Sequence, residues 1–118
     1  MELVCFQGID KENWAQLNAL IKRGEWEKIL IIKNKNAENF PITEKCELIK
    51  VNSDQSLLSL KSEIIEKLKP RLGKDFEVAL SLASGTGKEH MALISALLSI
   101  PVGIRLVAYT KDGVGFIN

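Results

Sequence analysis

The chain has 118 residues, of which 46% are hydrophobic and 26% are charged, and its 16 basic side chains nearly balance 15 acidic ones. A chain of this size and composition can bury a core of its own, so we expect residues 1–118 to form a single domain. The net charge of +1 provides no broad basic surface for a long nucleic acid, and no apolar stretch reaches the length of a membrane span. Because a secretory signal pattern is also absent, the sequence predicts a cytoplasmic protein that does not bind membranes.

The N-terminal third of the chain has the pattern of a strand–helix–strand unit. Residues 2–7 form a short apolar run that predicts a buried strand, and Asp10 is a suitable N-cap for a following helix. Apolar residues recur at spacings of three and four over 11–23, which predicts an amphipathic helix that stops at Gly24. The apolar, isoleucine-rich run 28–33 predicts a strand covered on both faces. Two such strands joined by a helix are almost always parallel neighbours.

The middle of the chain predicts a loop, a strand and a long helix. Residues 34–45 are polar and predict a loop or at most one helical turn. Residues 46–51 predict a third strand, after which the polar cluster 52–54 is suited to cap a helix that runs to Leu72. Pro70 is expected to kink or shorten the end of this helix.

The C-terminal part predicts a strand, a helix and a hairpin. Residues 76–82 form an apolar run, the turn 83–87 follows, and 88–99 has the periodicity of a helix. Two last strands, 104–110 and 114–117, are joined by a tight-turn sequence. Together the elements predict an α/β protein with a Rossmann-like three-layer fold: a mostly parallel sheet, helices on both faces and a C-terminal β-hairpin.

Two turns stand where ligands usually bind in such sheets, just beyond the carboxyl ends of strands. The first turn follows the first strand, and the second follows the fourth strand. They face the same crevice if these two strands are neighbours. The candidate ligand-binding residues are therefore Gln7, Gly8, Ile9 and Asp10 in the first turn, and Ser84, Gly85, Thr86, Gly87 and Lys88 in the second.

The second turn has the chemistry of an anion site. Gly85 and Gly87 allow the backbone to approach a ligand closely, and the amides of the helix start favour a phosphate. Ser84 and Thr86 add hydroxyls, and Lys88 adds a positive charge. The alternative is a capped helix start whose glycines form the turn and whose lysine is only solvated.

Other motifs fit this sequence poorly. A phosphate-binding Walker loop needs a glycine where Leu82 stands and a hydroxyl where Glu89 stands. The only histidine, His90, has no nucleophile or metal-ligand cluster near it in the sequence, so we expect a surface or packing role. Cys5 and Cys46 lie in predicted strands and are expected to be inert thiols. No metal and no cofactor are expected.

The pairing of Phe6-Gln-Gly-Ile-Asp10 with Leu82-Ala-Ser-Gly-Thr-Gly-Lys-Glu-His-Met-Ala92 resembles the CARF domains, the CRISPR-associated Rossmann folds. The resemblance spans nearly the whole chain, in a single-domain form. It implies a homodimer in which two pockets merge across the two-fold axis and bind a cyclic oligoadenylate, a small cyclic oligonucleotide that acts as a second messenger in antiviral defence. The turn departs from the family pattern in that Gly87 separates Thr86 from Lys88.

Three other functions remain open from the sequence. The same scaffold in this family also supports metal-independent ring nucleases, in which Lys88 would be the candidate catalytic residue that stabilises developing charge. A structural or interaction subunit would use the glycine turn only as a helix cap. A mononucleotide-binding protein would bind its ligand as a monomer.

Overall fold

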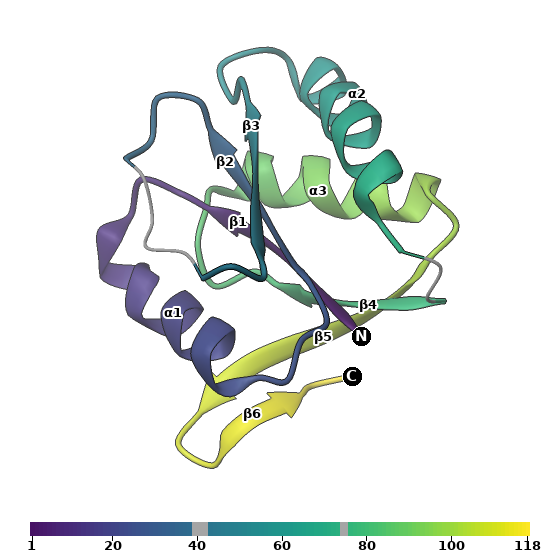
Figure 1. Ribbon diagram of the computed structural model, residues 1–118. Helices are drawn as coiled ribbons and strands as arrows, with labels where there is room; N and C mark the ends of the chain where they lie inside the picture. The colour runs from purple at the N-terminus through teal and green to yellow at the C-terminus, as the bar shows by residue number, and fades with distance from the viewer. Residues whose placement is uncertain (39–42, 74–75) are drawn as a thin grey trace.

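A six-stranded sheet in the order β3-β2-β1-β4-β5-β6 forms the centre of the computed structural model (Figure 1). The structure describes residues 1–38, 43–73 and 76–118. Strands β1 to β5 are parallel, and β6 runs antiparallel to β5. The strands are β1 (Glu2–Gln7), β2 (Ile29–Asn34), β3 (Cys46–Val51), β4 (Glu77–Ser81), β5 (Gly103–Thr110) and β6 (Gly113–Phe116). This order confirms the predicted Rossmann-like sheet and its C-terminal hairpin.

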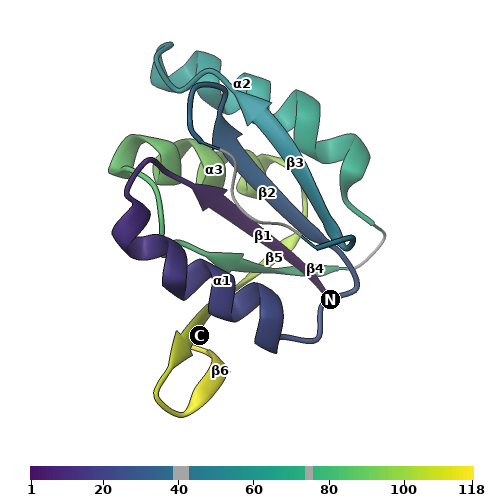
Figure 2. The ribbon, with the colours of Figure 1, turned by 60° about the vertical axis from the view of Figure 1, so that its left-hand side comes forward.

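Helices cover both faces of the sheet, as the three-layer prediction requires (Figure 2). Helix α1 (Trp14–Arg23) packs on one face, where Leu3 and Cys5 of β1 point. Helices α2 (Leu57–Leu68) and α3 (Gly87–Ser99) pack together on the other face, over Val4 and Phe6. Because side chains alternate along a strand, the single strand β1 contributes to two separate apolar cores.

Strand β1 lies at the middle of the sheet, and all six of its residues are buried. It pairs in parallel with β2 on one side, where Cys5 lies opposite Ile31, and with β4 on the other, where Cys5 lies opposite Ser81. The first and fourth strands are therefore neighbours. Their carboxyl ends carry the two turns singled out by the sequence.

The long middle helix is shorter than the sequence predicted. Helix α2 ends at Leu68, and a short 3-10 turn, η2 (Lys69–Arg71), contains Pro70, so the expected shortening at the proline is confirmed. The prediction that the polar cluster 52–54 caps this helix is wrong. The cap is Ser56, whose side-chain oxygen accepts the amide hydrogen of Ser59, because the chain makes a full turn over 52–55 before the helix begins.

Other predictions hold with small shifts at the ends of elements. Before α1, the residues Lys11–Asn13 form a short 3-10 turn, η1, and the helix ends at Gly24 as predicted. Within the predicted loop 34–45, residues 39–42 lie outside the described part of the chain, and the described remainder contains turns and no helix. Cys5 is buried and Cys46 is half-buried, and both are free thiols on strands separated by β2. No helix in the described ranges combines the length and apolar character needed to cross a membrane.

Candidate functional site

The site lies where the strand order reverses, at the carboxyl ends of β1 and β4. From β1 the chain proceeds to β2 and β3 on one side, and it later returns to place β4 and β5 on the other side. In open α/β sheets, the crevice at this reversal is the usual place for a ligand. Here it is bounded by the turn after β1 and the turn that leads from β4 into α3.

Hydrogen bonds tie the two turns together. The amide of Gly8 donates to Ser84 Oγ over 2.8 Å, and the Ser84 hydroxyl donates to Asp10 Oδ1 over 2.9 Å. The amide of Gly85 donates to the same carboxylate oxygen over 3.3 Å. We call these four residues, Gly8, Asp10, Ser84 and Gly85, the clasp. Ser84 is buried within it, so its hydroxyl serves to hold the two turns together.

Asp10 does not cap the helix that follows it, contrary to the prediction. No side-chain capping bond is present at this position, because the Asp10 carboxylate is directed to the second turn and to Asn13. Burial alone would raise the pKa of Asp10. Hydrogen bonds from Asn13, Ser84, Gly85 and its own backbone amide outweigh that effect and lower the pKa below the usual value. The carboxylate is thus stabilised as an anion inside the clasp.

The clasp brings the two backbones too close for side chains at its glycines. A Cβ atom on Gly8 would lie 2.3 Å from Asp10 Oδ1 and 2.8 Å from the Cα of Gly85. Gly85 has a φ of +112°, which side-chain-bearing residues rarely adopt, and a Cβ there would lie 2.9 Å from His90 Nε2. That nitrogen lies 2.6 Å from the carbonyl oxygen of Ser84 and donates a proton to it. His90 therefore holds the backbone of this turn in place through its hydrogen bond to Ser84.

Helix α3 starts with a complete capping box. The amide of Glu89 donates to Thr86 Oγ1 over 3.1 Å, and the amide of Thr86 donates to Glu89 Oε1 over 2.8 Å. The amides of Gly87 and Lys88 fall between these two bonds. They have no hydrogen-bond partner in the part of the chain that the structure describes, and both residues are exposed. Two free donors at the positive end of the helix dipole can bind an anion.

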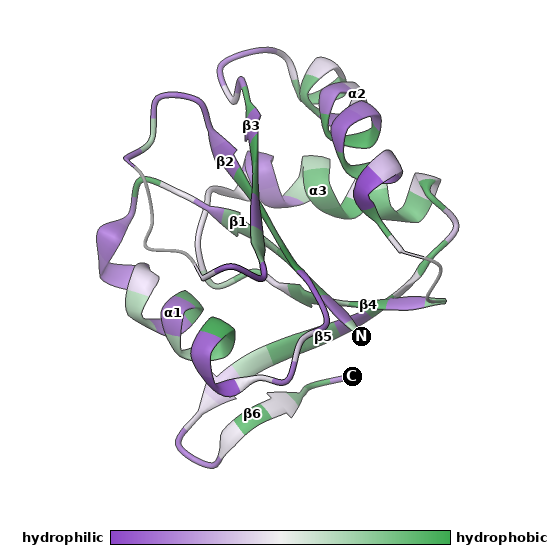
Figure 3. Ribbon diagram, viewed as in Figure 1, coloured by the Kyte–Doolittle hydropathy of each residue, from purple (hydrophilic) through white to green (hydrophobic). Residues whose placement is uncertain are grey.

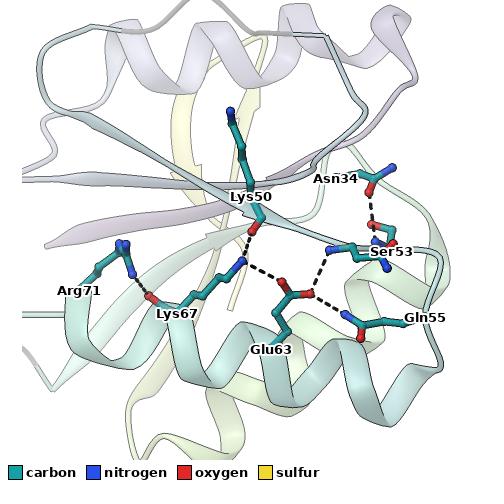
Figure 4. Close-up of polar contacts among 8 residues, drawn as sticks. Asn34, Lys50, Ser53, Gln55, Glu63, Lys67 and Arg71 are labelled. Carbon is teal, nitrogen blue, oxygen red and sulfur yellow. Dashed lines mark hydrogen bonds and ion pairs between the residues drawn. The ribbon is translucent and has the colours of Figure 1, made fainter.

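A polar network joins the start of α3 to the loop after β3. Lys88 Nζ donates to the carbonyl oxygen of Ser53 over 2.8 Å, and the Ser53 hydroxyl donates to Glu89 Oε2 over 2.6 Å. The amide of Ser53 in turn donates to Asn34 Oδ1, at the end of β2 (Figure 4). Glu63 on α2 accepts the amide of Asn52 and fixes the same loop. The ends of β2 and β3 are thus linked to the start of α3, and Lys88 is held beside the helix start.

The nine candidate residues separate into three groups. Gln7 is fully buried beneath the site, where its Nε2 donates to the carbonyl oxygen of Glu38 over 2.6 Å, so a bound ligand does not reach it without rearrangement. The clasp residues form the floor of the site. The exposed residues are Ile9, Thr86, Gly87 and Lys88, and these are the ones that a ligand can contact directly.

Two apolar clefts adjoin this edge of the molecule. One, of about 400 Å³, runs along the outer side of α3 from Gly87 and His90 to Leu98. The other, of about 330 Å³, lies at the end of β4 and against the middle of β5, where Leu82, Ala83 and Leu106 line it. The free amides of α3 therefore stand next to apolar surface, which suits a ligand with both anionic and aromatic parts.

Sequence reasoning missed three residues that shape the site: Ser53, Glu89 and His90. The Thr-x-x-Glu spacing from Thr86 to Glu89 is a capping-box signature and could have identified Glu89. No sequence signal indicates that Ser53 accepts Lys88, because 35 positions separate them. The contact between His90 and the Ser84 carbonyl depends on the left-handed conformation of Gly85, which the sequence only allows.

Comparison of the chain with models of known protein families and with curated proteins found no match.

Proposed function

We propose that this chain is a ligand-sensing domain that binds a cyclic oligoadenylate as a cytoplasmic homodimer, with the start of α3 as the phosphate-binding element. The observation that carries the proposal is the pair of free amides of Gly87 and Lys88 at the strand-order reversal. The resemblance of the two turns to CARF domains supports the choice of ligand class. A ring with an even number of identical nucleotides has a two-fold axis that a homodimer can match.

The exposed residues can divide the recognition of such a ligand among them. The amides of Gly87 and Lys88 donate to a phosphate, and the ammonium group of Lys88 has donors to spare beyond its bond to Ser53. Ile9, of which 76% is exposed, offers an apolar contact for a base. Phosphate groups would avoid the clasp, since Asp10 already holds the amide of Gly85 there.

The test is calorimetric titration with cyclic tri-, tetra- and hexa-adenylate, using a matched pair of variants at one position. Gly87→Pro removes an amide donor at the first helical position, where proline is well tolerated. Thr86 already has the extended conformation that must precede a proline (φ −90°, ψ 166°). Gly87→Ala keeps the amide, and its Cβ meets no atom within 4 Å.

We expect one ring per two chains for the wild type and for Gly87→Ala. Binding should weaken by roughly 10- to 100-fold in Gly87→Pro, the effect of losing one hydrogen bond to a charged group. Lys88→Ala should weaken it as well. Failure of every ring to bind a folded protein would overturn the proposal. Chromatography of the bound ring after incubation then separates a sensor, which returns it intact, from a ring nuclease.

A structural or interaction subunit is the second candidate function, and the capping box favours it. The amides of Gly85 and Thr86, which a phosphate loop would offer to its ligand, are already bound to Asp10 and Glu89. If the chain is such a subunit, we expect it to bind no cyclic or linear adenine nucleotide. We also expect Lys88→Ala to leave its binding to a partner protein unchanged. Saturable binding of ATP by a monomer would instead indicate a mononucleotide-binding protein.

A further inference from the structure

The charged residues of α3 are confined to its first turn. Among the 13 residues Gly87–Ser99, only Lys88 and Glu89 carry a formal charge, and most of the remaining helix is hydrophobic (Figure 3). The two side chains differ in their surroundings, because Lys88 is exposed whereas only 6% of Glu89 is. A nearly buried carboxylate therefore stands beside the free amides to which we assign a phosphate.

Both carboxylate oxygens of Glu89 are held in place. Oε1 accepts the amide of Thr86 over 2.8 Å, and Oε2 accepts the hydroxyl of Ser53 over 2.6 Å. These donors come from the turn before α3 and from the loop after β3, so the carboxylate would have to break one of the bonds to turn away. Because Thr86 and Gly87 are consecutive, a phosphate on the amide of Gly87 lies next to the carboxylate that holds the amide of Thr86.

The helix cap does not require a charge at this position. A glutamine makes the same capping box as a glutamate, since its side-chain oxygen also accepts the amide of the N-cap residue. The hydroxyl of Ser53 can accept a hydrogen bond as well as donate one, so it can also bind the amide group of a glutamine. What the charge of Glu89 adds is an interaction with the helix dipole and a repulsion of any anion at the neighbouring amides.

The formal charges within the clasp and the first turn of α3 sum to −1. Asp10 and Glu89 are negative and Lys88 is positive. Ser53 binds Lys88 through its carbonyl oxygen and Glu89 through its hydroxyl, so the positive charge is held close to a negative one. A terminal phosphate brings about 1.5–2 negative charges near pH 7, whereas a phosphodiester brings only about one. Since the repulsion grows with the charge of the ligand, this helix start disfavours terminal phosphates.

We propose that Glu89 determines the charge specificity of the site, so that the start of α3 accepts a singly charged phosphodiester and discriminates against nucleotides with terminal phosphates. The proposal rests on the proposed function for the position of the bound phosphate. Glu89 acts on the ligand through space and is a specificity-determining residue. Ser53 is a positioning residue, because it holds both the carboxylate of Glu89 and the ammonium group of Lys88.

The first experiment compares Glu89→Gln with the wild type by calorimetric titration with cyclic tetra-adenylate and with ATP in the absence of magnesium. We expect the variant to bind the ring about 3- to 10-fold more tightly and ATP about 30-fold or more tightly. A purely structural effect would change both affinities by the same factor. The matched control is Glu25→Gln, which removes the same charge from an exposed position before β2, at the opposite edge of the sheet. It should leave both affinities unchanged.

The second experiment needs no variant, and it keeps the inference testable if circular dichroism shows that Glu89→Gln does not fold. Linear di-adenylate has one phosphodiester and no terminal phosphate, and its 5′-phosphorylated form differs only by adding one. We expect the wild type to bind the form without the terminal phosphate more tightly. Equal or tighter binding of the 5′-phosphorylated form would overturn the inference.

The outcomes separate this inference from the proposed function. If the ring binds the wild type but Glu89→Gln gains no affinity for ATP relative to the ring, the proposed function stands and the inference is wrong. If no ring binds the wild type but Glu89→Gln binds ATP, the inference stands and the proposed function is wrong. If neither protein binds any of these ligands, both are wrong.

Discussion

The hydroxyl of Ser84 lies 2.9 Å from the carboxylate of Asp10, although 74 positions separate the two residues in the sequence. Because Ser84 also accepts the amide of Gly8, this one side chain satisfies a donor and an acceptor of the opposite turn. The bond joins the turns that follow β1 and β4 at the carboxyl ends of these two strands. It also holds the two glycine-containing turns together beneath the start of α3.

A double-mutant cycle should detect this bond directly. Ser84→Ala and Asp10→Ala should each lower the free energy of unfolding by about 1–3 kcal/mol, because each leaves a buried polar partner unsatisfied. The double variant should lose less than the sum of the two, with a coupling energy of about 0.5–3 kcal/mol. Urea denaturation of the four proteins provides the measurement. Strict additivity would show that the two side chains do not interact.

The two glycines of the second turn should respond in opposite ways to alanine. Gly85→Ala should destabilise the protein by more than about 1 kcal/mol, because its φ is +112° and the added Cβ meets His90 and Phe6. Gly87→Ala should have little effect or stabilise by less than about 1 kcal/mol, because its Cβ is unobstructed and the position is helical. Thermal unfolding of both variants tests the contrast. Equal losses at the two positions would contradict the described turn.

The capping box should contribute to stability through the hydroxyl of Thr86. Thr86→Ala should cost about 1 kcal/mol, since the amide of Glu89 loses its acceptor. Thr86→Ser keeps the hydroxyl and is the matched control, with little expected change. Chemical denaturation measures both. If Thr86→Ser is as destabilising as Thr86→Ala, the methyl group and its packing matter more than the cap.

The clasp should weaken at acidic pH. Because the folded protein lowers the pKa of Asp10, its carboxylate stabilises the fold above the unfolded pKa of about 3.9, and this contribution is lost as the pH falls through the folded value. The difference in unfolding free energy between wild type and Asp10→Asn should therefore shrink as the pH is lowered from 7 to below about 4. A difference that stays constant over this range would show that the charge of Asp10 is not what the clasp uses.

The order of elements followed from the sequence because each strand and helix has a strong local pattern. The apolar runs within 2–7 and 28–33 predicted a buried strand and a strand covered on both faces, and the structure buries residues 2–7 and 29–33. The turns after β1 and β4 were expected to face the same crevice if these strands were neighbours, and the structure shows that they are. The predicted caps were less successful, since Asp10 and the 52–54 cluster make long-range contacts that replace local capping.

The hydrogen bonds within the site could not be predicted from local sequence patterns. Whether the Asp10 carboxylate binds its own helix or the opposite turn depends on the distance between two backbones, and that distance is set by the packing of β1 against β4. The division of the nine candidates into buried, clasped and exposed residues has the same origin. Gln7, for example, has the alternation of an inward-facing strand residue, and only the fold shows that it lies under the site rather than in it.

The central position of β1 also has a consequence for how the chain acquires its site during synthesis. When residues through β3 have emerged, β1 can pair with β2, but its other edge stays open until β4, which begins at Glu77, has also been made. That open edge belongs to a strand with four consecutive apolar residues, Leu3–Phe6, and such an edge readily pairs with the wrong strand. Docking of β4 therefore removes the exposed edge and assembles the clasp in one step, so that a chain without its site is also a chain prone to aggregate.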